Sequence, residues 1–276
     1  MQRIPTTLVL GATGKTGGRV ADALAARGWP VRRGSRAATP AFDWEDATTW
    51  SAALEGVDQV YLTFQPDLAM PGAVEAIRTF TDLAVDRGVS RLVLLSGRGE
   101  PAAQACERIV QQSGLGWTVV RAGWFMQNFS EGHLLGPVLQ GVVKLPVPDT
   151  VEAFVDVDDI AEVAVAALTD PRHDGEVYEV TGPRLVWLSE AVATVAAASG
   201  REVRFESLEP AAYVEYLVGA QVPRPLAAFL ADLFPMTLDG RNTYVTDGVQ
   251  RALGRPPRDF TAYARDAAAA GAWRTA

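Results

Sequence analysis

Three glycines at regular spacing form the motif in this chain with the clearest chemical meaning. Gly11, Gly14 and Gly17 follow the apolar stretch 7–10 and precede a helical pattern. Glycines in such a strand–turn–helix unit permit a tight turn and let the backbone approach a pyrophosphate, while the helix N-terminus offers N–H groups to the anion. The spacing therefore predicts a dinucleotide-binding turn. The alternative is a glycine-rich hairpin that binds no ligand.

The same segment also resembles the end of a nucleoside triphosphate P-loop. Gly14, Lys15 and Thr16 match the last three positions of that motif. The motif would need a further glycine at position 9, and the chain has Val9 there. The sequence thus excludes a P-loop kinase or NTPase at this turn.

The residues at the end of the second predicted strand indicate which dinucleotide is bound. No acidic residue stands between Asp22 and Asp43, where NAD enzymes commonly place a carboxylate for the ribose hydroxyls. A 2′-phosphate needs a cation instead, so the sequence favours NADP (NADPH). Because side chains alternate along a strand, we expect one cation, Arg36, to meet this phosphate beside Ser35. The interval offers these polar and basic candidates: Arg32, Arg33, Ser35 and Arg36.

The first half of the chain alternates short apolar runs with amphipathic segments, which is typical of βαβ units. Glycines at positions 28, 56 and 88 mark the ends of three of the predicted helices. The predicted strands are 7–10, 31–35, 41–43, 59–63, 91–96 and 117–121. The predicted helices are 19–27, 47–54, 74–87 and 100–113. The fold class expected is α/β, a doubly wound parallel-sheet Rossmann fold with a small, mainly helical C-terminal cap.

The second half of the chain does not continue the alternation of apolar runs and amphipathic segments. Residues 123–148 are rich in glycine, proline and aromatics, which predicts a long loop over the carboxyl edge of the sheet. A helix over 155–168 and a strand over 176–180 should follow, and the chain from Leu188 should be mainly helical. Prolines should divide this last part, at positions 210, 223, 225 and 235. We expect an NADP-binding Rossmann domain over 1–150, with the remaining sheet elements and a substrate-binding cap over 151–276.

Composition limits the other function classes. The net charge is −8 and the basic residues are scattered, which argues against a nucleic-acid partner. No apolar run reaches the 18 residues of a membrane span, and no signal region precedes the first strand, so we expect a cytoplasmic protein. With the single cysteine Cys106 and the two distant histidines His133 and His173, we expect no metal site.

These residues carry a resemblance over nearly the whole chain. The chain resembles the NmrA-like, atypical branch of the short-chain dehydrogenase/reductase superfamily, and within it the agroclavine dehydrogenase-like proteins of ergot alkaloid pathways and their bacterial relatives. The matching segments are 10–16, the arginine after the second strand, 95–100, 117–121, 125–128 and 154–159.

The resemblance implies roles for several groups of residues. The turn Thr13, Gly14, Lys15 and Thr16 would line the pyrophosphate, and Arg36 would meet the 2′-phosphate. The adenine would lie near Asp43 and Trp44. The ribose and nicotinamide edge would follow Thr63, Phe64, Gln65 and Pro66, then Ser96, Gly97 and Arg98. The nicotinamide would be backed by Gly123, Trp124 and Phe125.

The chain departs from commoner members of the superfamily in one respect. Their Tyr-x-x-x-Lys dyad protonates a carbonyl oxygen, but here Gly11 and Gln140 stand four residues before the only lysines, Lys15 and Lys144. Without that general acid, an electron-poor substrate that needs little protonation is the better expectation. Ser96 offers a hydroxyl that could donate to a substrate, and no catalytic residue is assigned. Asp156, Asp158 and Asp159 are expected to cap a helix rather than to form a carboxylate site.

Aromatic and amide side chains after the sixth predicted strand, together with one tyrosine of the cap, are the candidates for substrate contact, although aromatics at such spacing also fill cores. These candidates are Trp124, Phe125, Gln127, Asn128, Phe129 and Tyr216. The leading hypothesis is an NADPH-dependent reductase of an apolar or aromatic small molecule: an imine, an iminium or a quinone. A non-catalytic NADP-binding redox sensor is the alternative, and an isomerase or dehydratase is a third. The sequence leaves a homodimer open.

Overall fold

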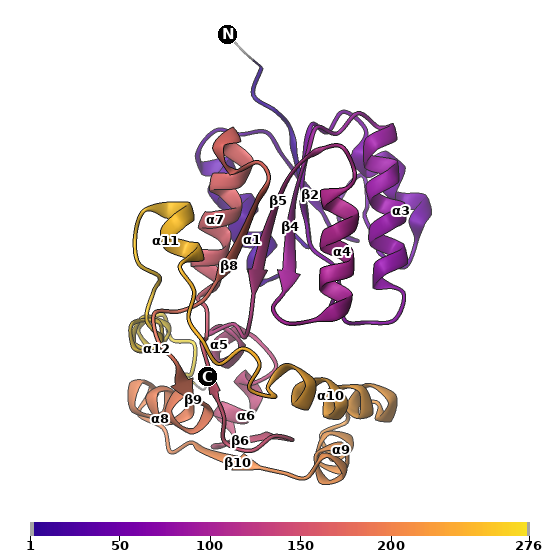
Figure 1. Ribbon diagram of the computed structural model, residues 1–276. Helices are drawn as coiled ribbons and strands as arrows, with labels where there is room; N and C mark the ends of the chain where they lie inside the picture. Colours follow the sequence, from indigo (N-terminus) through magenta and orange to yellow (C-terminus); the bar gives the residue numbers. More distant parts are fainter. Residues whose placement is uncertain (1–2, 275–276) are drawn as a thin grey trace. The chain divides into compact units, whose positions relative to one another are not determined.

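The computed structural model describes residues 3–274, and its central element is a six-stranded parallel sheet in the order β2-β1-β3-β4-β5-β8 (Figure 1). Every neighbouring pair in this sheet is parallel. The strands are β1 (Thr7–Leu10), β2 (Val31–Gly34), β3 (Gln59–Leu62), β4 (Arg91–Gly97), β5 (Gly116–Ala122) and β8 (Glu176–Val180). The order reverses between β1 and β3, so the doubly wound Rossmann fold predicted from the sequence is confirmed.

Helices cover both faces of this sheet. On one face α1 packs against α7, and on the other α3 packs against α4 (Figure 1). The helices are α1 (Lys15–Ala26), α2 (Trp50–Leu54), α3 (Ala73–Asp86), α4 (Pro101–Gln111), α7 (Val157–Thr169) and α11 (Gly248–Leu253). In α3, Ile77, Phe80 and Ala84 are buried at helical spacing and form the face toward the sheet. Gly88, with φ of +77°, ends that helix as predicted.

The chain forms two compact units, each built from three separate stretches of sequence. The sheet unit contains residues 3–122, Val157–Val180 and Thr246–Pro256, and the second unit contains Gly123–Asp156, Thr181–Val245 and 257–274. β8, one of the sheet elements expected after residue 150, pairs with β5 and belongs to the sheet unit. Met1 and Gln2, part of the N-terminal segment in which we expected no signal region, lie outside the described residues.

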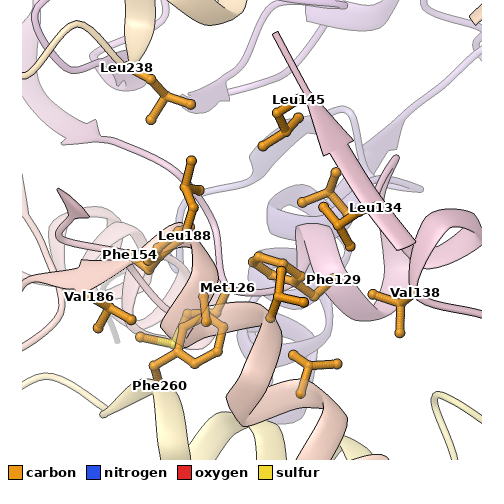
Figure 2. Packing of buried hydrophobic residues seen from close by; sticks show 14 of the residues in the cluster. Met126, Phe129, Leu134, Val138, Leu145, Phe154, Val186, Leu188, Leu238 and Phe260 are labelled. Atoms are coloured by element: carbon orange, nitrogen blue, oxygen red, sulfur yellow. The ribbon is translucent and has the colours of Figure 1, made fainter. Parts of the chain in front are cut away.

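The second unit is mainly helical and has its own core. Its core side chains include Phe129, Phe154 and Phe260, whose ring centroids lie 5.3–5.9 Å apart (Figure 2). The helices are α5 (Asn128–Glu131), α6 (Leu135–Leu139), α8 (Leu188–Ser199), α9 (Pro210–Gly219), α10 (Arg224–Thr237) and α12 (Phe260–Ala269). Two short sheets pair β6 (Val142–Leu145) with β10 (Arg204–Ser207) and β7 (Val151–Glu152) with β9 (Val186–Trp187).

Three predictions for local structure were wrong. Residues 41–43 form no strand: Ala41 and Phe42 are irregular, and Asp43 forms only an isolated bridge to Asp46 around a turn at Trp44 and Glu45. Phe42 packs into an aromatic cluster, and the Asp43 carbonyl accepts a hydrogen bond from the Trp50 indole. The segment 123–148 contains α5, α6 and β6, since apolar side chains such as Val138 and Leu145 pack into the core of the second unit. Pro235 lies inside α10 and does not divide it.

Within residues 3–274, no helix is both long enough and apolar enough to cross a bilayer.

Candidate functional site

The glycine turn after β1 has the geometry of an anion site. Gly11 has φ of +60°, and its carbonyl accepts a hydrogen bond from the Gly14 N–H at 2.8 Å. A Cβ at Gly17 would lie 2.3 Å from the Gly11 carbonyl oxygen, so only glycine allows α1 to start this close to the turn. Gly14 occupies the N-cap of α1 without a side-chain cap, which leaves N–H groups at the helix N-terminus for a ligand.

The three arginines after β1 have separate roles. Arg32 donates to the carbonyls of Ala53 and Glu55, and Arg33 pairs with Asp22. Arg36 is exposed and lines a pocket, where it makes no hydrogen bond or ion pair with another described residue. Because Arg32 and Arg33 bind other groups of the protein, Arg36 is the one of these three arginines left for a ligand, and it is the one named from the sequence.

This pocket has a volume of about 380 Å³, which suits one nucleotide-sized part of a larger ligand. It joins the glycine turn to the end of β2 and to the segment 42–45. Nine residues predicted to bind the cofactor line it: Gly11, Thr13, Gly14, Ser35, Arg36, Asp43, Trp44, Gln65 and Pro66. Gly34, Phe42 and Glu45 also line it and were not predicted. The glycine at position 34 could have indicated close packing at the end of β2. In the structure a Cβ there would lie 2.7 Å from the Leu10 side chain.

Trp44 forms the aromatic wall of the pocket. Its indole N–H donates to the Thr63 carbonyl at 3.0 Å, and its ring lies 5.0 Å from the ring of Phe64. Thr63 and Phe64 therefore support this wall without lining the pocket themselves. Lys15, Thr16 and Gly17 stand in the first turn of α1, where Thr16 is buried. The glycine turn, the aromatic wall and a guanidinium on one pocket together fit a dinucleotide phosphate, with Gly11, Gly14, Ser35 and Arg36 as the residues that would hold it.

Ser96 and Arg98, expected along the nicotinamide edge, have buried side chains that bind carboxylates of the sheet unit. Ser96 Oγ donates to Glu107 Oε1 at 2.6 Å, and Arg121 Nε donates to the same oxygen at 2.9 Å. Arg98 Nε donates to Glu179 at 2.8 Å, and Arg121 also reaches Glu179. This network ties the segment after β4 to α4, β5 and β8. Cofactor contacts by these two residues stay a prediction.

Gly97 packs against the carboxyl group of Glu100 in the sheet unit. A Cβ at Gly97 would lie 2.3 Å from Glu100 Oε2, so a larger residue would displace that carboxyl. Glu100 shares a hydrogen bond with Asp67, whose Oδ1 also accepts from the Ala69 N–H at 2.7 Å. Burial raises the pKa of Asp67 above its ordinary value. The requirement for glycine at position 97 thus has a packing cause that needs no ligand.

The remaining candidates belong to the second unit. Gln127 is buried and donates to Asp156 at 2.7 Å, and Phe125 forms a single bridge to Val155. Phe129 is fully buried in the core, which favours a packing role for its side chain. Gly123 precedes these residues, and Asn128 begins α5. Their substrate or cofactor contacts stay predictions.

Trp124 and Tyr216, by contrast, are half-buried and belong to an aromatic group of the second unit. The ring of Trp124 lies 5.4 Å from Phe234 and 5.9 Å from His133. Tyr216 lies 6.1 Å from Tyr213. Such a group can hold a planar apolar molecule, or it can simply stabilise the unit.

Comparison with known proteins agrees with the resemblance seen in the sequence. Residues 11–171 match the family described as NAD(P)H-binding, and residues 103–255 match the NmrA-like family. An NAD(P)H azoreductase of Xenophilus azovorans is 31% identical and covers 95% of this chain, which spans 98% of that protein. Agroclavine dehydrogenase of Claviceps fusiformis is 30% identical, with 95% and 96% covered.

A solved structure of an NADPH-dependent quinone oxidoreductase of Escherichia coli with bound NADPH has the same fold, with a TM-score of 0.74, 22% identity, and 95% and 99% of the two chains covered. The relatives named above are oxidoreductases, and the pocket described here lies in the part of the chain that matches the NAD(P)H-binding family. This chain belongs to the NmrA-like family of NAD(P)H-binding oxidoreductases.

Proposed function

We propose that this protein is an NADPH-dependent reductase of an apolar, electron-poor small molecule: an imine, an iminium or a quinone. The observation that carries the proposal is the position of Arg36 on the pocket of the glycine turn, while Arg32 and Arg33 bind other groups of the protein. A guanidinium in that position recognises a phosphate through charge-assisted hydrogen bonds. When bound, NADPH would supply a hydride to the substrate.

The chain's own residues would act mainly by binding and orientation. The backbone N–H groups at the start of α1 and the guanidinium of Arg36 would fix the phosphates. Trp44, held by its hydrogen bond to Thr63, would present an aromatic surface to the nucleotide. For the substrate, we propose contacts from the half-buried rings of Trp124 and Tyr216 in the second unit.

The sequence supports a substrate that needs little acid catalysis. Neither lysine has a tyrosine four residues before it, so the dyad that protonates ketone oxygens in related enzymes is missing from this chain. An iminium or a quinone is already electrophilic and accepts a hydride more readily than a simple ketone. The names of the two relatives, an azoreductase and an agroclavine dehydrogenase, agree with substrates of this kind.

The test is a screen of NADPH oxidation under anaerobic conditions, with quinones, cyclic imines and preformed iminium ions in one set and simple ketones in another. We expect oxidation above the substrate-free rate with at least one electron-poor class and little or none with ketones. Tight NADPH binding without turnover of any compound would contradict a reductase and favour a cofactor sensor.

A further inference from the structure

The pocket of the glycine turn holds charges of both signs. Arg36 and Ser35 line it from the end of β2, and Asp43 and Glu45 line it from the turn that follows. Among the described residues no ion pair joins Arg36 to either carboxylate. A ligand in this pocket therefore meets a guanidinium and two acidic side chains that do not neutralise one another.

The two acidic residues differ in what they already bind. Asp43 Oδ1 accepts a hydrogen bond from the Glu45 N–H at 3.1 Å, so this carboxylate closes the turn. The Asp43 carbonyl accepts from the Trp50 indole at 2.6 Å, which fixes the same turn from the other side. The Glu45 carboxylate makes no hydrogen bond or ion pair with another described residue, and the residue is exposed on the pocket.

A carboxylate and a guanidinium favour different forms of the cofactor. A carboxylate accepts hydrogen bonds from neighbouring ribose hydroxyls and repels a 2′-phosphate, whereas a guanidinium attracts the phosphate. Exposed charges act on each other weakly because water screens them, so the repulsion from Glu45 should lower phosphate binding without abolishing it. In this pocket Arg36 thus favours NADPH, and Glu45 favours NADH.

We propose that Glu45 is a specificity-determining residue that limits the preference for NADPH, so that the protein also binds NADH. The inference rests on the proposed function in placing the cofactor's adenosine part at this pocket. The two acidic residues then have separate roles: Asp43 stabilises the turn by its hydrogen bond, and Glu45 repels the 2′-phosphate. Arg36 still favours NADPH, and Glu45 reduces the ratio of the two affinities.

The experiment is calorimetric titration of NADPH and NADH into the wild-type protein and the variant Glu45→Gln, with Glu55→Gln as the matched control. Glu55 is an exposed glutamate of the same unit that does not line the pocket. Glu45→Gln should bind NADPH about twofold to fivefold more tightly and NADH no more tightly, which is the size expected for one screened charge. Glu55→Gln should change neither affinity.

Raising the salt concentration should shrink the effect of Glu45→Gln, because screening weakens a charge effect and leaves a purely structural one unchanged. An unchanged ratio of the two affinities in Glu45→Gln would overturn the inference alone. Failure of the wild-type protein to bind either cofactor would overturn the proposed function and this inference together. Melting temperatures show whether each variant is folded.

Discussion

The ammonium of Lys144 lies over the ring of Tyr216, with Nζ 5.2 Å from the ring centroid. Lys144 also lies 3.6 Å from Glu206 Oε1. Burial, assisted by the nearby negative charge of Glu206, raises the pKa of Tyr216. In a catalytic Tyr-Lys dyad the lysine lowers the pKa of the tyrosine. The fold thus brings a tyrosine and a lysine together, but their contact is a cation–π interaction. Burial and Glu206, not the lysine, leave the phenol a weaker acid than usual.

Removing the Tyr216 hydroxyl should therefore cost little activity. We expect Tyr216→Phe to lower kcat for an electron-poor substrate by about tenfold or less, because loss of a true general acid costs about 10²–10⁴-fold. The same limit applies to Ser96→Ala, since the Ser96 hydroxyl already donates to Glu107. Steady-state kinetics with saturating NADPH measure this. A loss of more than about a thousandfold with NADPH binding intact would identify a proton donor and contradict the account.

The glycine turn should not tolerate a methyl group at position 17. In Gly17→Ala the new Cβ would meet the Gly11 carbonyl oxygen at 2.3 Å, so the turn or α1 must shift. We expect a loss of about 1–3 kcal/mol in the free energy of unfolding and much weaker NADPH binding. Chemical denaturation and calorimetry measure the two effects.

Gly18→Ala is the matched control for that substitution. It places the same methyl group one residue later in α1, 3.5 Å from the Ala12 carbonyl oxygen, which is ordinary contact. Alanine also favours a helix over glycine, by up to about 1 kcal/mol. Equal effects of the two substitutions on NADPH binding would show that the close approach at Gly17 is not required.

His173 should make stability depend on pH on the acid side of neutrality. The residue is buried, its Nδ1 lies 2.7 Å from the Tyr178 hydroxyl, and burial lowers its pKa below the ordinary value of 6.5. The unfolded chain then binds a proton more readily than the folded chain. The stability due to neutral His173 is present above about pH 6.5 and is lost as the pH falls through the lower pKa of the folded state.

Melting temperatures measured between about pH 5 and pH 8 test this. The wild-type protein should lose more stability on acidification than His173→Gln, whose side chain stays neutral. His133→Gln, which changes an exposed histidine of the second unit, should follow the wild type. Parallel curves for wild type and His173→Gln would refute the prediction.

The sequence predicted those parts of the structure that depend on local pattern. The predicted bounds of β1 and β8 are those of the structure, and Arg36 was chosen among the arginines because it stands at the end of the second predicted strand. Pattern failed where tertiary contacts decide the conformation. Residues 41–43 look like a strand, but the Asp43 carbonyl binds a side chain seven residues later and the chain turns.

The same limit explains the residues that were missed. Glu45 lines the pocket from the turn at Trp44 and Glu45, so no strand or helix periodicity could assign it. Ser96 looked available as a donor, yet its partner Glu107 stands in a separate helix, and the network with Arg121 forms only when α4 packs on the sheet. Lys144 and Tyr216 are 72 residues apart in the chain and meet only in the folded second unit.

The most direct test of the account compares NADPH and NADH binding by calorimetry in the wild type, Arg36→Ala and Arg33→Ala. Arg33→Ala removes an exposed ion pair with Asp22 outside the pocket and should change neither affinity. Arg36→Ala should weaken NADPH binding by about 1.5–3 kcal/mol, the size of a lost charge-assisted contact, and leave NADH binding nearly unchanged. The account predicts that the wild type binds NADPH more tightly than NADH. Equal affinities of the wild type for NADPH and NADH would contradict it, and so would an Arg36→Ala variant that binds NADPH as tightly as the wild type.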